Sequence, residues 1–202
     1  RVLARRRSDS RVRCHSIDFS DSIEFDVSFL KRSEDRPWSD YVKGVIQQFQ
    51  LRDFEPGGLD LLIQGDVPLG AGLSSSAALE VAVAEALRCL CGFDLSRVEM
   101  ALLCQAAEGG FVGVQCGIMD QFVSVLAEEG SALSLDCRDL SYSRVSLGEG
   151  VGIVICDSRV QRSLGDSAYN RRREECEEAV QSLKPVLEGI EALRDVTEEQ
   201  LQ

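Results

Sequence analysis

The sequence predicts an α+β domain, in which helices and strands interleave without regular strand–helix–strand repeats. Two patterns support this class. The apolar run Leu59–Ile63 has the length of one strand, whereas Trp38, Val42 and Phe49 belong to an apolar pattern with helical spacing. No internal repeat or low-complexity segment appears, and 202 residues are enough for one sizeable domain with its own core.

The first predicted elements are strands at residues 12–18 and 23–27, joined by a turn rich in Ser and Asp. Six arginines occur among the first thirteen residues, and we expect an exposed turn there that leads into the first strand. An amphipathic helix over residues 38–49 follows. The strand Leu59–Ile63 and a helix over residues 77–87 then complete the first half of the domain.

The next helix has a recognisable start. Ser96 and Glu99 have the spacing of a capping box, which predicts a helix from there to about Glu108. Gly109 and Gly110 follow directly and can end it. A further helix begins near Met119, because apolar residues recur on one face of the segment behind it.

The remaining elements are two strands and one helix. Strands are predicted at Ser131–Leu135 and at residues 151–156, and the unbroken apolar composition of the second is typical of a buried strand. A strongly charged helix is predicted over residues 170–183, and it stops before Pro185.

Composition narrows the function classes. A net charge of −12 and a pI near 4.6 argue against nucleic acids and anionic membranes as partners. No apolar run approaches the roughly 20 residues of a membrane-spanning helix, and no signal-peptide pattern is present. The eight cysteines form no C-x-x-C pair, so we expect free thiols and a cytoplasmic location. An arginine-rich transit peptide at the start of the chain is the alternative.

A glycine- and serine-rich loop between a predicted strand and a predicted helix is the most informative segment. Its glycines allow a bare, tight turn, and the helix that follows offers free N–H groups to an anion. Serine hydroxyls can also bind phosphate oxygens or a magnesium ion. We therefore predict that the loop binds the phosphates of ATP through residues Gly70, Ala71, Gly72, Leu73, Ser74, Ser75 and Ser76.

Other readings of this loop fit less well. A dinucleotide fingerprint needs a third glycine where the chain has Ser75, and no lysine of a Walker A loop occurs between Lys43 and Lys184. An ordinary serine-rich helix N-cap remains the structural alternative.

The string P-L-G-A-G-L-S-S-S-A-A-L-E resembles the second motif of the GHMP kinases, a superfamily of small-molecule ATP kinases. Three further segments resemble the galactokinase family: C-Q-A-A-E followed by F-V-G-V-Q-C-G-I-M-D-Q-F, then S-A-L-S-L-D-C-R, and finally D-S-A-Y-N-R-R. The resemblance implies the fold of the GHMP kinase N-terminal domain, which is similar to domain 2 of ribosomal protein S5.

The family's opening sugar-binding motif and its glycine-rich third motif do not occur here. We therefore expect a piece of a galactokinase that is inactive alone. Residues 1–184 would form the N-terminal, ATP-binding domain without its first strands, and residues 185–202 would begin the connection to a C-terminal domain.

The resemblance implies a role for each matching residue. Asp120 would be the catalytic base that activates the anomeric hydroxyl of galactose for attack on the γ-phosphate of ATP. Ser76 and Glu108 would hold Mg²⁺. Trp38 and Tyr41 would lie near the adenine. The predicted sugar-binding residues are Gly117, Asp120 and Tyr169.

Structural alternatives exist for several of these residues. Asp120 could simply stabilise a helix N-terminus, and the three aromatic residues could be core residues. Two further functions stay open, a non-catalytic sensor of galactose and ATP and a kinase for a related sugar such as arabinose. The uninterrupted S-S-S-A-A segment favours the enzyme. The expected partners are galactose and ATP, without nucleic acid, membrane or protein partner.

Overall fold

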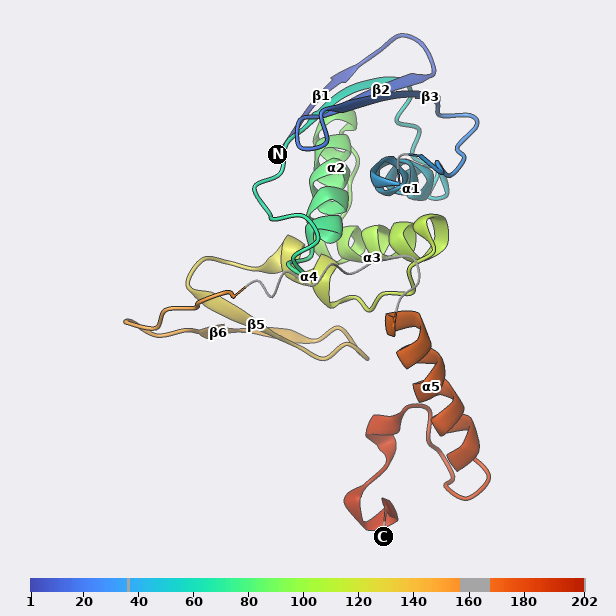
Figure 1. Ribbon diagram of the computed structural model, residues 1–202, viewed down its shortest axis with the longest axis vertical. Coiled ribbons are helices and arrows are strands. Elements are labelled where there is room, and N and C mark those ends of the chain that lie inside the picture. Colours follow the sequence, from blue (N-terminus) through green and yellow to red (C-terminus); the bar gives the residue numbers. More distant parts are fainter. Residues whose placement is uncertain (36, 157–167, 202) are drawn as a thin grey trace. The chain divides into compact units, whose positions relative to one another are not determined.

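The computed structural model describes residues 1–35, 37–156 and 168–201 (Figure 1). The chain divides into two compact units, Arg1–Arg162 and Ser163–Gln202, and each is described by itself. The first unit holds the sheet, the core and most of the predicted site residues.

A four-stranded sheet forms one layer of the first unit. It contains β1 (Val2–Arg6), β2 (Arg11–Ser16), β3 (Asp21–Asp26) and β4 (Leu59–Ile63) in the order β1-β4-β2-β3. Strand β4 runs antiparallel to β1 and parallel to β2, so the last strand in sequence lies inside the sheet. The predictions of β2, β3 and β4 are confirmed, with shifts of one or two residues at the ends of the first two.

Strand β1 corrects the expectation of an exposed turn at the arginine-rich start. Val2 and Ala4 turn toward the core, whereas Arg5 and Arg7 form ion pairs with Asp60 of β4. The arginines therefore mark the polar side of an edge strand, where charged side chains are common.

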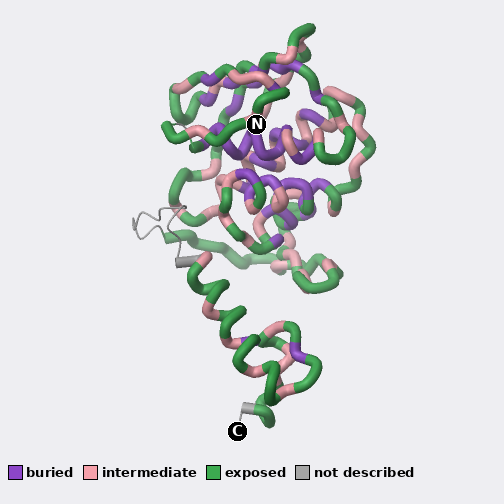
Figure 2. The backbone as a smooth tube through the Cα atoms, turned by 90° about the vertical axis from the view of Figure 1, so that its right-hand side faces the viewer, coloured by how far each residue is buried: buried purple, intermediate pink, exposed green. Residues whose placement is uncertain are grey.

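Helices α1 (Trp38–Gln50) and α2 (Ser75–Cys91) cover one face of the sheet, and α3 (Arg97–Ala107) packs against these two helices. Figure 1 shows α1 and α2 directly under the strands and α3 crossing beneath them. Buried residues gather in these elements, as Figure 2 shows. The core residues from the sheet alternate along each strand, as the pleat requires: Val12, Cys14, Leu59, Leu61 and Ile63.

Helices α1 and α3 approach closely at Gly44. A Cβ atom there would lie 3.1 Å from both the Ala107 carbonyl oxygen and the Phe111 Cβ atom. A side chain at this position would force the two helices apart, so the glycine sets their spacing.

Helix α3 begins with the predicted capping box, in which Ser96 and Glu99 bond each other's backbone N–H groups. The α-helix ends at Ala107, within one residue of the predicted end. The two glycines do not stop the helical backbone, which continues as a π-helical turn, Glu108–Val112, up to Gly113 with φ +90°. Burial of Phe111 holds this turn against the core, and such turns occur often at functional sites.

The rest of the first unit is helix α4 (Met119–Leu126) and a hairpin of β5 (Ser131–Leu135) and β6 (Tyr142–Ser146). Helix α4 and strand β5 were predicted, whereas β6 was not. Residues 151–156, predicted as a buried strand, form neither helix nor strand, and Val154 is 85% exposed. A strand needs a neighbour for its backbone hydrogen bonds, and no ladder within the described residues includes this segment.

The second unit consists of α5 (Ala168–Leu183) and two short 3₁₀ turns, Leu193–Asp195 and Glu198–Leu201. The helix ends before Pro185, as predicted. Its charged surface forms i,i+4 pairs, with 3.1 Å from Arg171 to Glu175 and from Arg173 to Glu177. Throughout the described part of the chain, no helix is long and apolar enough to cross a bilayer.

Candidate active site

The predicted phosphate loop joins β4 to α2 and has an unusual backbone. Gly70, Gly72 and Ser74 all adopt left-handed conformations, with φ of +70°, +72° and 58°. A Cβ atom at either glycine would meet nothing within 4 Å, so the backbone rather than crowding demands glycine there. Left-handed serine is uncommon and often marks a functional segment.

Helix α2 begins at Ser75 directly after this turn. The N-cap residue Ser74 makes no side-chain bond to the helix, so the first N–H groups keep their hydrogen-bonding capacity. The three hydroxyls of Ser74, Ser75 and Ser76 have no protein partner within the described residues. Free N–H groups, free hydroxyls and the positive end of the helix dipole together suit an anion such as phosphate.

A cleft of about 240 Å³ lies beside this junction. Leu69 and Ser75 line it from the loop, Ala78 and Ala82 line it from α2, and residues 63–67 line it from the end of β4. Trp38 and Phe19 form an aromatic wall, their rings stacked with centroids 5.9 Å apart. The structure thus brings Trp38 together with the predicted phosphate loop.

Tyr41 does not line this cleft. It is buried in α1, one helical turn after Trp38, where burial and then the nearby carboxylate of Glu108 raise the pKa of its phenol. Glu80 and Cys116 act in the same direction. Tyr41 therefore does not line the cleft that Trp38 lines, and it lies near a cluster of acidic side chains instead.

That cluster is formed by Glu80, Glu108, Cys116 and Gln121, which we call the carboxylate cluster. The Gln121 amide Nε2 donates to Glu80 Oε2 at 3.1 Å and to Glu108 Oε2 at 2.6 Å. The Cys116 thiol donates to the same Glu108 oxygen, with 3.3 Å between Sγ and Oε2. Glu80 and Gln121 are fully buried and Glu108 is 4% exposed. Glu108 is therefore not the solvated residue at a helix end that its sequence position suggests.

Acidic groups lie close together in this buried cluster. Burial, with the nearby Glu108 carboxylate, raises the pKa of Glu80 well above its ordinary value. Burial and Glu108 also raise the pKa of the Cys116 thiol to about 12. Glu80 and Cys116 thus both resist ionisation beside Glu108. A bound cation would favour their charged forms and offset this repulsion.

The donor set fits Mg²⁺. Ser76 lies one helical turn before Glu80 on the same face of α2, so its hydroxyl is on the side of the cluster. Glu80 Oε1 and Gln121 Oε1 are buried without a hydrogen-bond partner, which leaves unused oxygen acceptors nearby. No group of three or more His, Cys, Asp or Glu among the described residues could hold a metal alone. Mg²⁺ commonly takes one or two protein ligands and completes its shell with phosphate and water.

Asp120 lies in the first turn of α4, next to Gln121. Ile118 and Phe122 are buried and anchor this turn, whereas Asp120 is only partly buried and makes no hydrogen bond or ion pair within the described residues. Gly117 lies in the exposed segment just before the helix. Tyr169 belongs to the first turn of α5 in the second unit, and its side chain lies outside the described residues.

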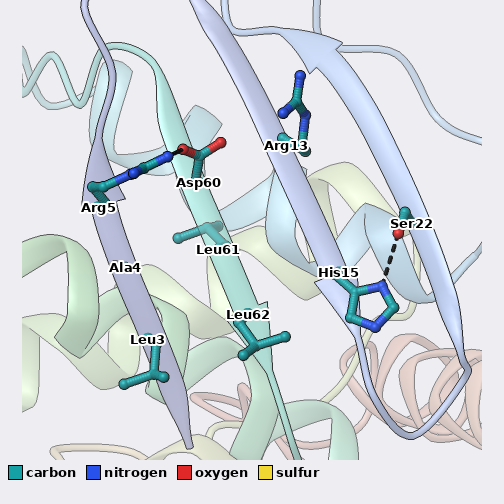
Figure 3. A pocket seen from close by; sticks show the side chains of 9 residues that line it. All are labelled: Leu3, Ala4, Arg5, Arg13, His15, Ser22, Asp60, Leu61 and Leu62. Atoms are coloured by element: carbon teal, nitrogen blue, oxygen red, sulfur yellow. Dashed lines mark hydrogen bonds and ion pairs between the residues drawn. The ribbon is translucent and has the colours of Figure 1, made fainter.

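A second hollow, of about 390 Å³, covers the outer face of the sheet and contains none of the predicted site residues (Figure 3). Its side chains pair across the strands, with Arg5 Nε donating to Asp60 at 3.1 Å and His15 Nδ1 lying 2.7 Å from the Ser22 hydroxyl. It is a shallow surface of cross-strand pairs, and we assign it no chemistry.

Sequence reasoning missed Glu80, Gln121 and Phe19. Glu80 carries a signal that could have found it, because a charged residue within the apolar string A-A-L-E-V-A must be buried or paired. The part played by Gln121 depends on three elements meeting in space and leaves no local pattern.

Comparison with known proteins identifies the family. Residues 40–128 match the family described as GHMP kinases N terminal domain, and this segment includes the loop, the carboxylate cluster and Asp120. The chain contains a GHMP kinase N-terminal domain. The fold and the family resemblance predicted from the sequence are therefore confirmed.

Relatives of this GHMP kinase domain are galactokinases. The chain is 51% identical over 195 residues to the galactokinase of Chloroflexus aggregans and 48% identical over 200 residues to that of Roseiflexus sp. (strain RS-1). These matches cover 96% and 99% of this chain but 50% and 51% of the relatives. The chain thus spans about half the length of the curated relatives it matches.

Solved structures of kinases have a similar fold. The galactokinase of Lactococcus lactis, crystallised with galactose, matches 98% of this chain and 52% of its own with a TM-score of 0.87 and 34% identity. A mevalonate kinase from Methanococcus jannaschii matches 61% of this chain with a TM-score of 0.52 and 17% identity, which supports the fold alone.

Proposed function

We propose that this chain provides the ATP- and magnesium-binding part of a galactokinase, which transfers the γ-phosphate of ATP to the anomeric hydroxyl of galactose to form galactose 1-phosphate. Similarity to curated galactokinases at about half identity supports the substrate. One structural observation supports the chemistry most. Helix α2 begins at the glycine-serine loop and, one turn after Ser76, contributes Glu80 to the carboxylate cluster.

The nucleotide would occupy the cleft beside the loop. Its adenine would pack against Trp38 and Phe19, and its phosphates would lie at the N-terminus of α2, bound by the hydroxyls of Ser74–Ser76 and free N–H groups. Tyr41 is left out of this proposal because it does not line the cleft.

Ser76 and Glu108 would hold Mg²⁺, which supplies positive charge that neutralises the phosphates during transfer. The protein's own part is to fix those two oxygens. Ser76 is fixed in the first turn of α2, and Glu108 is fixed directly after the capped helix α3.

Asp120 would accept the proton of the sugar hydroxyl, and Gly117 and Tyr169 would contact the sugar. A partly exposed carboxylate that has no protein partner within the described residues is available for that role. General-base catalysis contributes about 10²–10⁴-fold to such a step. We also propose a cytoplasmic location, on the eight cysteines without a C-x-x-C pair.

A chimera tests the function. In it, this chain replaces the matching 195-residue segment of the Chloroflexus aggregans galactokinase. We expect ADP release that depends on galactose and is much slower with arabinose. Tight binding of galactose and ATP without turnover would identify a sensor instead. A higher rate with arabinose than with galactose would show that the proposed sugar substrate is wrong.

A further inference from the structure

The side chain of Gln121 joins three separate elements through one amide group. Its Nε2 lies 3.1 Å from Glu80 of α2 and 2.6 Å from Glu108, which follows α3, while Gln121 itself belongs to α4. Both amide hydrogens are therefore used on carboxylates. The opposite orientation of the amide would place its oxygen against the Glu108 oxygen at 2.6 Å, where two acceptors would repel, so the contact with Glu108 favours this orientation.

The side-chain hydrogen bonds to Glu108 fall on only one of its two carboxylate oxygens within the described residues. Gln121 and Cys116 both donate to Oε2, whereas Oε1 accepts no hydrogen bond from the described residues. Two donors on one oxygen fix the plane and the direction of the carboxylate. The other oxygen stays available as a ligand.

We propose that Gln121 is a positioning residue that orients the Glu108 carboxylate for Mg²⁺, and that Glu80 in turn fixes the Gln121 amide. This inference rests on the proposed function, because it takes Glu108 as a metal ligand. Gln121 directly follows Asp120 in the first turn of α4. The same anchor therefore fixes the helix turn that presents the candidate base.

A wholly structural role for Gln121 predicts different results. If the amide only satisfied buried polar groups, its loss would lower stability and leave metal binding unchanged. If it orients Glu108, its loss weakens metal binding beyond any change in stability. Residues that orient metal ligands typically contribute about 10- to 100-fold to metal affinity.

The experiment uses the chimera with Mn²⁺ in place of Mg²⁺ and a non-hydrolysable ATP analogue, and counts free Mn²⁺ by electron paramagnetic resonance. We expect Gln121→Leu to raise the Mn²⁺ dissociation constant about 10-fold or more. The matched control is Gln48→Leu, which removes another buried glutamine that bonds the Ala106 carbonyl and Arg52. A Mn²⁺ constant within twofold of the parent in Gln121→Leu would overturn the proposal.

Variants of Glu80 test the second link and remain informative if Gln121→Leu fails to fold. Glu80→Gln keeps an oxygen that accepts from Gln121, so we expect Mn²⁺ affinity within about threefold of the parent. Glu80→Leu removes that acceptor and should weaken Mn²⁺ binding about 10-fold. Equal Mn²⁺ affinities in the two Glu80 variants would contradict the link.

A double variant separates this inference from the proposed function. If Gln121 acts through Glu108, adding Gln121→Leu to Glu108→Gln should weaken Mn²⁺ binding no further. An additive loss would show that Gln121 acts elsewhere and overturn the inference alone. Parent-like Mn²⁺ binding in Glu108→Gln itself would overturn the assigned ligand, and with it the metal site of the proposed function.

Discussion

The ring of Phe19 stacks on the ring of Trp38 with an angle of 13° between their planes. Trp38 is also held at its edge, where its indole Nε1 donates to Asp21 at 3.1 Å. Phe19 comes from the turn between β2 and β3 and is 47% exposed, so the sheet and α1 each contribute one ring to the aromatic wall of the cleft. This pair offers a flat apolar surface of the kind an adenine ring packs against.

Removing the ring of Phe19 should weaken ATP binding. Stacked aromatic pairs contribute about 0.5–1.5 kcal/mol beyond their buried area, so we expect the ATP dissociation constant of Phe19→Ala to rise about two- to tenfold. Isothermal titration calorimetry measures it. Phe29→Ala is the control, since Phe29 is 76% exposed and does not line the cleft. Equal ATP affinity in both variants would place the adenine elsewhere.

A side chain at Gly72 should impair nucleotide binding more than folding. Gly72→Val forces a branched residue to φ +72° and fills space that a phosphate would occupy. Gly57→Val is a matched control, because Gly57 has φ +69° with equally open surroundings and lies outside the cleft. We expect both to lose stability by a similar amount, about 1–2 kcal/mol, and only Gly72→Val to lose ATP affinity. Thermal melts and ATP titrations measure the two effects.

Asp120→Asn should lower turnover without lowering ATP affinity. The amide keeps the shape of the side chain but cannot accept the proton of the sugar hydroxyl, so we expect the chimera to lose at least ~100-fold in kcat. Asp94→Asn, an exposed substitution between α2 and α3, should leave kcat unchanged. Near-parent turnover in Asp120→Asn would make Asp120 a helix-start residue only.

Glu80 should make the stability of the chain depend on pH. Burial raises the pKa of this carboxyl in the folded state, so the folded chain holds a proton that the unfolded chain releases above about pH 4.3. The contribution of Glu80 to the free energy of unfolding is therefore full below that pH and falls as the pH rises toward the folded-state pKa.

The amide in Glu80→Gln cannot titrate, so this variant should not lose that part of its free energy of unfolding as the pH rises. Urea unfolding of parent and variant between pH 5 and 8 measures the difference, which we expect to shift in favour of the variant as the pH rises. The slope for one group cannot exceed about 1.4 kcal/mol per pH unit. Parallel stability curves would show that Glu80 is ionised in the folded chain.

Local signals predicted much of the fold and the loop. The apolar pattern of α1 and the capping box of α3 depend on residues a few positions apart, and both were read correctly. The left-handed turn before α2 was likewise implied by its glycines. Asp120 was correctly placed in the first turn of α4.

The errors arose where distant residues decide the structure. Strand β1 depends on its backbone pairing with β4, more than fifty residues away in the sequence. The end of α3 was predicted within one residue, but the π-helical turn that continues through Gly109 and Gly110 was not, and in it Phe111 is buried. The carboxylate cluster could not be predicted as a unit, because its members come from α2, the π-helical turn after α3, the segment before α4 and α4 itself.

The tight approach at Gly44 brings helix α1 against the backbone that leads into Glu108 of the carboxylate cluster. The carbonyl that a methyl group at position 44 would strike belongs to Ala107, the residue directly before Glu108. Substitution there would be transmitted along one peptide unit to the carboxylate. If Glu108 holds Mg²⁺ as proposed, Gly44→Ala should therefore disturb metal binding, although Gly44 does not belong to the carboxylate cluster.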